Sequence, residues 1–236
     1  MAQKKLLRFA QIKEMPHVLE YPENMKGEWH SFFKNNNPIV LELACGRGEY
    51  AIGLAGLCNN KNFIGVDVKG NRMYIGAKKA MDLQYSHVAF LRTQIEMINQ
   101  YFDAAEVDEI WITFPDPQLR TSKAKKRLTH PRFLRLYQQI LKPGGCIHLK
   151  TDSPALHLFT SKVIDMYGLT LLHQSDNIYA EDHSAELDIK THYESLDIAQ
   201  SKKIHYAQFS LPDTMPDLDE ALMENLKQTE KGYEHA

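Results

Sequence analysis

The fold of this chain is decided by the stretch Pro38-Ile39-Val40-Leu41-Glu42-Leu43-Ala44-Cys45-Gly46-Arg47-Gly48. Here an apolar run of strand length leads directly into a turn that contains two glycines. Because glycine adopts backbone conformations that other residues avoid, Gly46 and Gly48 allow a tight turn and let a ligand approach the backbone. The pattern indicates a buried strand that ends in a ligand-binding turn.

Strand-length apolar runs continue to alternate with helical patterns along the chain. We expect strands over residues 38–43, 62–66, 87–91, 108–114 and 146–150, with weaker candidates over 169–174 and 204–210. We expect helices over residues 49–57, 71–83, 131–141, 154–167 and 218–227. Because strands that alternate with helices form βαβ units, the sequence predicts an α/β fold with a seven-stranded, mostly parallel sheet and helices on both faces.

Length and composition favour one globular domain. The chain has 236 residues, of which 43% are apolar and 25% charged. A chain of this size buries a full core without disulfides. We expect a flexible arm over residues 1–35, a main domain over 36–212, and an acidic C-terminal helix over 213–236 that is part of this domain or appended to it.

Several classes of protein are disfavoured by the composition. No run of 18 apolar residues is present, and the N-terminus lacks the apolar stretch of a signal peptide, so we expect no membrane segment. The cysteines Cys45, Cys58 and Cys146 show no C-x-x-C spacing. We therefore expect neither a disulfide scaffold nor a metal site, and a protein of the reducing cytoplasm.

Positive charge is concentrated in one segment. The 28 Lys and Arg residues against 30 Asp and Glu residues give a net charge of −2, yet residues 117–150 contain no acidic residue. The basic residues at the start of this segment are Arg120, Lys123, Lys125, Lys126 and Arg127. A local basic field in a neutral protein suggests an anionic partner, and a solvated helix face is the alternative.

Two carboxylates near the glycine turn suggest a nucleoside cofactor. Asp67 ends the second strand, where a carboxylate can accept both hydroxyls of an adenosine ribose. The glycines and this acid fit either a dinucleotide or S-adenosylmethionine, and a purely structural turn is the remaining alternative. Glu42 stands inside an apolar strand, where a carboxylate is costly unless it meets a donor or a cation. Because Glu42 would repel a pyrophosphate but not a sulfonium compound, the residues favour S-adenosylmethionine.

Two further carboxylates follow later strands. Asp116 lies between Pro115 and Pro117, which restrict the backbone and hold this carboxylate at the edge of the sheet. Asp152 follows the fifth strand, where it either reaches the same edge or caps the helix expected from residue 154. Since ligands of open parallel sheets bind outside the carboxyl ends of the strands, both are candidate site residues.

Several short motifs together resemble one family. Residues 41–48 and 63–67 resemble the first two motifs of class I methyltransferases. More specific are Phe114-Pro115-Asp116-Pro117 with its basic tail, Lys150-Thr151-Asp152, and Thr191-His192-Tyr193-Glu194. Over residues 38–210 these motifs are similar to the bacterial single-chain tRNA (guanine-N7-)-methyltransferases. The resemblance implies a Rossmann-like three-layer fold, S-adenosylmethionine as cofactor, methylation of guanosine N7 in the variable loop of tRNA, and a monomer or weak homodimer.

The resemblance also assigns roles to residues. Cofactor residues are Glu42 near the methionine end, Asp67 at the ribose, Gln94 where the family usually has Asp or Asn beside adenine, and Asp116, together with Gly46 and Gly48. Asp116 is also the catalytic residue. Substrate residues are Arg120 (in place of a lysine), Asp152, Thr191, His192, Tyr193 and Glu194. From the charge of the basic segment, we also expect Lys123, Lys125, Lys126 and Arg127 to contact phosphates. Gln118 replaces a frequent tryptophan, so a stacking surface is lost there or supplied by another residue.

The expected chemistry needs no general base. Guanine N7 carries a lone pair and no proton, so alignment and electrostatics lower the barrier. Asp116 either stabilises the positive charge of the product base or accepts the guanine N1 and N2 protons. Two alternatives remain: an NAD-dependent oxidoreductase on the same core, for which no evident hydride-handling residue is in place, and a non-catalytic RNA-binding module, which would not need the acids.

Overall fold

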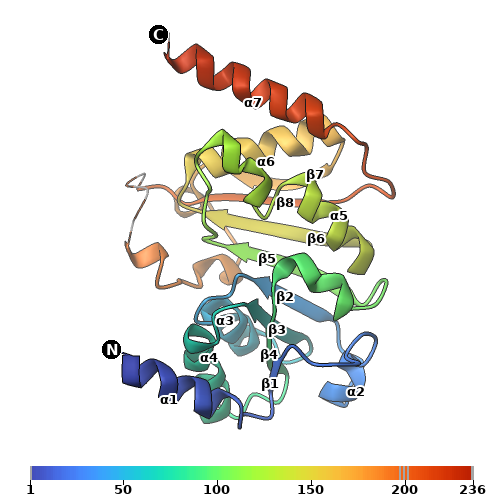
Figure 1. Cartoon of the computed structure of the whole chain (residues 1–236), viewed down its shortest axis with the longest axis vertical. Helices are drawn as coiled ribbons and strands as arrows, with labels where there is room; N and C mark the ends of the chain where they lie inside the picture. The colour runs from blue at the N-terminus through green and yellow to red at the C-terminus, as the bar shows by residue number, and fades with distance from the viewer. Residues whose placement is uncertain (1, 197, 199, 201, 235–236) are drawn as a thin grey trace.

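The computed structural model describes residues 2–196, 198, 200 and 202–234 and contains one eight-stranded sheet between two layers of helices (Figure 1). The strands are β1 (Val18–Glu20), β2 (Ile39–Leu43), β3 (Asn62–Asp67), β4 (Val88–Arg92), β5 (Val107–Thr113), β6 (Leu141–Thr151), β7 (Thr170–Ser175) and β8 (His205–Ser210). The α-helices are α1 (Ala2–Ile12), α2 (Trp29–Phe33), α3 (Glu49–Leu57), α4 (Gly70–Asp82), α5 (Pro131–Ile140), α6 (Pro154–Tyr167) and α7 (Asp219–Glu234). Short 3-10 helices include η1 (Ile95–Gln100), η2 (Thr121–Lys126) and η3 (Ile178–Ala180).

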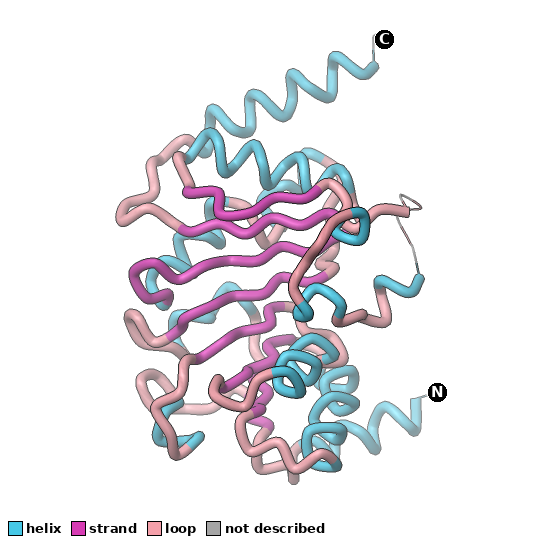
Figure 2. The backbone as a smooth tube through the Cα atoms, turned by 180° about the vertical axis from the view of Figure 1, so that it is seen from behind, coloured by secondary structure: helices cyan, strands magenta, loops and turns pink. Residues whose placement is uncertain are grey.

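The strand order explains where a ligand can bind. The order is β1-β4-β3-β2-β5-β6-β8-β7, and Figure 2 shows the strands as one continuous layer. Strands β1 to β6 pair in parallel, whereas β8 is antiparallel to both β6 and β7. The order reverses between β2 and β5, because β3 lies on one side of β2 and β5 on the other. The carboxyl ends of β2 and β5 therefore form the switch point at which such sheets bind ligands.

The helices divide between two apolar cores. On one face, Leu41 of β2 shares a core with Phe133 of α5 and Phe159 of α6. On the other face, Val40 shares a core with residues of α1, α3 and α4, including Ala51. Because neighbouring side chains of a strand point to opposite faces, β2 carries apolar side chains on both sides, which explains why it is apolar throughout except at Glu42. Within the described part of the chain, no helix combines the length and the apolar character needed to cross a membrane.

The structure confirms the α/β prediction and the seven expected strands but differs at the N-terminus. Residues 1–35 were expected to form a flexible arm, whereas the described part contains α1, β1 and α2. Strand β1 pairs with β4 as an eighth strand. Trp29 is fully buried, its ring stacks on Phe102 at 5.1 Å, and its Nε1 donates to the Tyr101 carbonyl at 2.8 Å. A three-residue strand and a five-residue helix are too short to show a period in the sequence.

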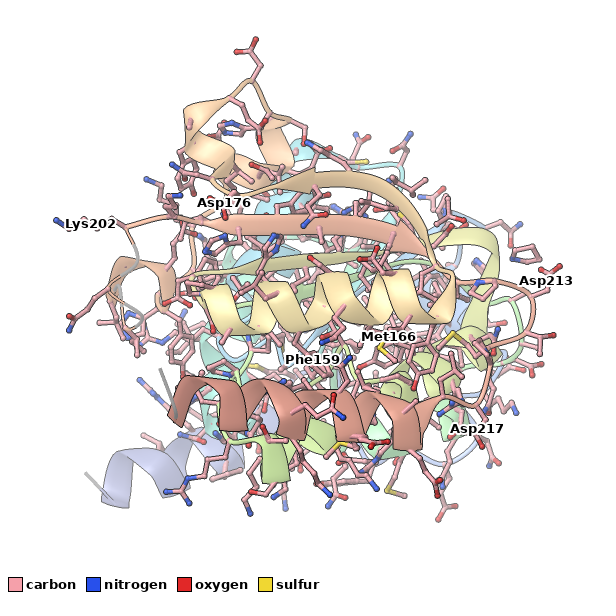
Figure 3. All side chains as sticks on the ribbon, turned by 90° about the horizontal axis from the view of Figure 1, so that it is seen from above. Phe159, Met166, Asp176, Lys202, Asp213 and Asp217 are labelled. Atoms are coloured by element: carbon pink, nitrogen blue, oxygen red, sulfur yellow. The ribbon has the colours of Figure 1, made fainter. Side chains whose placement is uncertain are left out.

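The C-terminal helix packs on the main domain. Leu222 of α7 is fully buried in the core shared with α5 and α6. Asp219 accepts hydrogen bonds from Arg135 of α5 and from the Tyr167 hydroxyl of α6. Figure 3 shows α7 lying alongside α6. These contacts hold α7 against α5 and α6.

Candidate functional site

A cavity of about 810 Å³ opens at the carboxyl ends of the parallel strands. Of the sixteen site residues predicted from the sequence, seven line it: Gly46, Asp67, Gln94, Asp116, Lys126, Asp152 and Tyr193. Nine others, all within the described residues, lie outside the lining: Glu42, Gly48, Arg120, Lys123, Lys125, Arg127, Thr191, His192 and Glu194. The volume is that of a site for a nucleoside-sized ligand.

The glycine turn forms one wall of the cavity. Gly46 and Gly48 both have left-handed backbone conformations, with φ of +54° and +67°. A Cβ on Gly48 would lie 2.3 Å from Cε1 of Phe90, so Gly48 is required by packing beneath the turn. Gly46 lines the cavity itself and exposes its backbone to a ligand.

Asp67 ties the glycine turn to the end of β3. Its Oδ2 accepts a hydrogen bond from the Gly46 amide at 2.9 Å, and its Oδ1 accepts one from the Lys69 amide at 2.8 Å. Each carboxylate oxygen can accept a second hydrogen bond. The acid is thus held rigidly at the cavity wall with acceptor capacity left for a pair of hydroxyls.

An unsatisfied hydroxyl marks the neighbouring wall. Thr93 is fully buried at the cavity, and its Oγ1 has no hydrogen-bond partner among the described residues. Buried polar atoms are normally paired, so this hydroxyl is an exception beneath the cavity wall. Gln94 follows it with an exposed amide. Thr93 was not predicted as a site residue, because threonine at a strand end gives no specific signal in the sequence.

Asp116 is presented to the cavity by a constrained loop. Phe114 and Gln118 on either side have positive φ, both +47°. The Gln118 amide donates to Asp116 Oδ1 at 3.0 Å. The loop adopts a left-handed conformation at two non-glycine residues, which persists only where the surroundings enforce it. The prediction that Asp116 lies at the sheet edge is confirmed.

Arg127 holds this loop in its conformation. It was predicted to contact phosphates, but the structure places it under the loop. The side chain is buried, with the residue only 5% exposed. Its guanidinium donates to the carbonyls of Pro117 at 3.2 Å, Gln118 at 3.0 Å and Leu119 at 3.2 Å. It also lies 4.4 Å from the ring centroid of Phe159. A guanidinium used in this way positions the loop from beneath.

Glu42 lies below the glycine turn and not at the cavity surface. It is only 2% exposed. Its Oε2 accepts a hydrogen bond from the Ala51 amide at 2.8 Å, and its Oε1 accepts one from the Thr113 hydroxyl at 3.3 Å. Burial raises the pKa of Glu42 to about 8, against the opposing effect of these hydrogen bonds. The residue therefore connects β2, α3 and β5 directly under the site.

The end of β6 resolves the two roles considered for Asp152. Ser153 is the N-cap of α6, since its hydroxyl accepts a hydrogen bond from the Leu156 amide at 3.3 Å. Asp152 lines the cavity. The neighbouring serine thus takes the capping role, and Asp152 reaches the same edge as Asp116.

The 191–194 stretch reaches the cavity through one residue. Tyr193 lines the cavity, and its hydroxyl accepts a hydrogen bond from Arg72. Glu194 is directed away from the cavity, because its Oε2 pairs with the buried Lys150 ammonium at 3.1 Å. Thr191 Oγ1 accepts from the Glu194 amide at 3.2 Å, and the His192 amide donates to Glu49 at 2.8 Å. The predicted direct substrate contact of Glu194 is replaced by a positioning role.

The basic residues form a border around the cavity. Arg120, Lys123 and Lys125 are exposed on and beside η2, and Lys126 of η2 lines the cavity. Three further cations line it that the sequence analysis did not select: Lys69, Arg72 and Arg132. Lys69 and Arg72 follow β3 in the chain, so only the fold brings them to the basic segment.

Comparisons with known proteins identify the family. A family model described as "Putative methyltransferase" matches residues 36–207. A tRNA (guanine-N(7)-)-methyltransferase of Bacteroides thetaiotaomicron is 46% identical over 222 residues, which cover 90% of this chain and 87% of that relative. A protein of the same name from Porphyromonas gingivalis is 46% identical over 213 residues, which cover 85% of this chain and 86% of that relative. This chain belongs to the tRNA (guanine-N7-)-methyltransferase family.

Solved structures support the same fold for this family member. The 16S rRNA methyltransferase KamB aligns with a TM-score of 0.60 at 14% identity, covering 81% of this chain and 96% of that structure. The 16S rRNA (adenine(1408)-N(1))-methyltransferase of Catenulisporales acidiphilia aligns with a TM-score of 0.57 at 13% identity, covering 79% and 93%. At such low identity the similarity shows the fold alone, which is that of class I methyltransferases.

Proposed function

We propose that this protein transfers the methyl group of S-adenosylmethionine to N7 of a guanosine in tRNA, with Asp116 facing the reacting base. The observation that carries the proposal is the single cavity wall that joins Gly46 and Asp67 at the ends of β2 and β3 to Asp116 at the end of β5. This wall follows the switch point of the sheet. The names of the relatives supply the substrate, tRNA, and the target atom, guanine N7.

The residues of this wall fit S-adenosylmethionine. Asp67 has acceptor capacity for the two ribose hydroxyls, and the exposed Gln94 amide lies at the adjoining wall for the adenine. The glycine turn leaves room at Gly46 for the remainder of the molecule. When bound, the cofactor supplies an electrophilic methyl group on a positively charged sulfur.

The protein's part in the reaction is positioning and electrostatics. Guanine N7 needs no deprotonation, so the residues around it align the base rather than remove a proton. The Asp116 carboxylate stabilises the positive charge that the base gains, or it accepts the guanine N1 and N2 protons. Leu119 is 66% exposed at the cavity and supplies an apolar surface beside Gln118, where a tryptophan is frequent in the family.

Exposed cations guide the RNA to the cavity. Lys123, Lys125 and Lys126 of η2, together with Arg120, present positive charge next to Asp116. Phosphate contacts of this kind fix the position of RNA without reading its sequence. N7 lies in the deep groove of an A-form helix, so the target guanosine must be exposed by the loop that carries it. We expect a cytoplasmic enzyme that acts as a monomer or weak homodimer.

The proposal is tested by incubating the protein with bulk tRNA and S-adenosylmethionine that carries a labelled methyl group. Nuclease digestion and mass spectrometry then identify the methylated base. We expect 7-methylguanosine from the wild type. In Asp116→Asn we expect a single-turnover rate at least tenfold lower with cofactor affinity retained. Another methylated base would retain the methyltransferase class and contradict the proposed target.

A further inference from the structure

A cluster of two histidines and an aspartate lies near the outer strands of the sheet. Its aspartate, Asp176, is labelled in Figure 3. His157 lies in α6, Asp176 directly follows β7, and His205 begins β8. One ligand atom from each residue lies within 4.8 Å of the others. None of the three is among the described residues that line the cavity, so the cluster is separate from the methyl-transfer site.

Both imidazoles are buried but incompletely hydrogen-bonded. His157 and His205 are 5% and 3% exposed. Nδ1 of His157 and Nε2 of His205 have no hydrogen-bond partner among the described residues, although buried polar atoms are normally paired. The ring centroids are 4.9 Å apart, and His205 Nδ1 lies 3.0 Å from Asp176 Oδ1. Each histidine therefore keeps one unpaired ring nitrogen in a cluster that also contains a carboxylate.

His157 is suited to act as a neutral ligand. Gln174 donates to His157 Nε2 at 3.0 Å and to Ser161 Oγ at 2.9 Å. The oxygen and nitrogen of a glutamine amide are interchangeable in assignment, and with its oxygen facing Nε2 the amide would hold the proton there and leave a lone pair on Nδ1 for a metal. Histidine ligands of metals usually have such a partner on the second nitrogen.

We propose that His157, Asp176 and His205 bind one divalent transition-metal ion of the Zn²⁺ class, with water completing the coordination. Two imidazoles and one carboxylate are a donor set that suits Zn²⁺. Mg²⁺ and Ca²⁺ prefer oxygen ligands and fit this set poorly. Lys203 binds the other oxygen of Asp176 at 2.6 Å, but both side chains are exposed and one carboxylate oxygen is enough for the metal.

A metal at this site would fix both ends of the connection between β7 and β8. Asp176 and His205 stand at the two ends of the connection between β7 and β8, which carries Tyr193 to the cavity. A metal that joins both ends to α6 closes this connection at its base. Cross-links that close long loops restrict the unfolded chain and order the loop. The metal would thus act as a positioning device for the connection, outside the reacting groups.

Isothermal titration of the full chain, first treated with a chelator, tests the site with ZnCl₂ and MgCl₂ as probes. We expect one Zn²⁺ per chain and no binding of Mg²⁺. Asp176→Asn removes a ligand at an exposed position and should weaken Zn²⁺ binding at least tenfold, as should His157→Gln. Asp182→Asn, an exposed carboxylate in the same connection, is the matched control and should leave the affinity unchanged.

Limited proteolysis provides a second readout that is independent of methyl transfer. Zn²⁺ should slow cleavage within residues 177–204 in the wild type and in Asp182→Asn, but not in Asp176→Asn. The proposal is overturned if Zn²⁺ does not bind, or if Asp176→Asn and His157→Gln bind it as tightly as the wild type. It is also overturned if Asp188→Asn, which breaks the exposed His183–Asp188 pair, abolishes binding instead.

Discussion

Lys150 and Glu194 form a buried ion pair that joins the end of β6 to the connection carrying Tyr193. The Lys150 Nζ lies 3.1 Å from Glu194 Oε2, and Lys150 is 0% exposed. The same ammonium donates to the carbonyls of Leu187 at 2.8 Å and Ile189 at 2.9 Å. Burial lowers the pKa of Lys150, and Glu194 opposes this shift. One buried cation therefore anchors a long connection at the edge of the site.

Breaking this pair should destabilise the protein and weaken tRNA binding. Glu194→Ala leaves the ammonium without its counter-charge, which costs about 3–5 kcal/mol for a buried pair. Urea denaturation measures the loss of unfolding free energy, and the KM for tRNA should rise because Tyr193 is released. Glu181→Ala, an exposed acid in the same connection, is the control. A loss no larger than that of the control would show that the pair does not anchor the connection.

Gly48→Ala should destabilise the protein by the clash that its Cβ creates with Phe90. The contact of 2.3 Å forces the ring or the turn to move, and overpacking of this kind costs about 1–3 kcal/mol. Gly144→Ala is the matched control, because Gly144 also has a positive φ, of +78°, but no described atom lies within 4 Å of its Cβ position. Thermal unfolding of both variants separates the clash from the backbone strain. Equal losses would contradict the packing role of Gly48.

The exposed lysines of η2 should set the salt dependence of tRNA binding. Lys125→Gln and Lys126→Gln should each reduce the slope of log affinity against log salt by about 0.7–0.9, the value of one lost phosphate contact. Filter binding over a series of salt concentrations measures this slope. Lys79→Gln, on the exposed face of α4, is the control. Unchanged slopes for the η2 variants would place the RNA on another surface.

Arg127 should behave differently from these lysines. Arg127→Ala removes the guanidinium that holds three carbonyls of the Asp116 loop, at a cost of about 2 kcal/mol or more in unfolding free energy. The single-turnover rate should fall because Asp116 is no longer held, whereas the salt slope should not change. A reduced salt slope with unchanged stability would restore Arg127 as a phosphate contact.

Glu42 should make stability depend on pH. Its pKa of about 8 in the folded protein exceeds the value of 4.5 for a free side chain, so the folded state binds the extra proton between these values. The contribution of this proton to the stability of the folded state is fully present below pH 4.5 and is lost as the pH rises to about 8. Between these values the folding equilibrium constant falls by up to roughly tenfold per pH unit. Glu42→Gln should lack this loss. If the stability of the wild type and of Glu42→Gln changed in parallel from pH 5 to pH 8, the raised pKa of Glu42 would be contradicted.

The sequence predicts the repetitive part of this fold well, because periodicity reports burial. The boundaries of α3 and α6 match the structure, whereas β1 is too short to show a pattern. Site residues at strand ends, such as Asp67 and Asp116, are predictable because the carboxyl ends of parallel strands lie together at the switch point of the sheet. Arg127 and Glu194 were assigned by motif, and their burial depends on contacts with Phe159 and Lys150, which lie far away in the chain. The metal cluster has no sequence spacing that would reveal it.

A crystal structure of the protein with S-adenosylmethionine bound tests the central claim most directly. The account predicts the ribose hydroxyls on Asp67, the adenine beside Thr93 and Gln94, and the methyl group directed toward Asp116. Density for the cofactor elsewhere, or a methyl group turned away from Asp116, would contradict it.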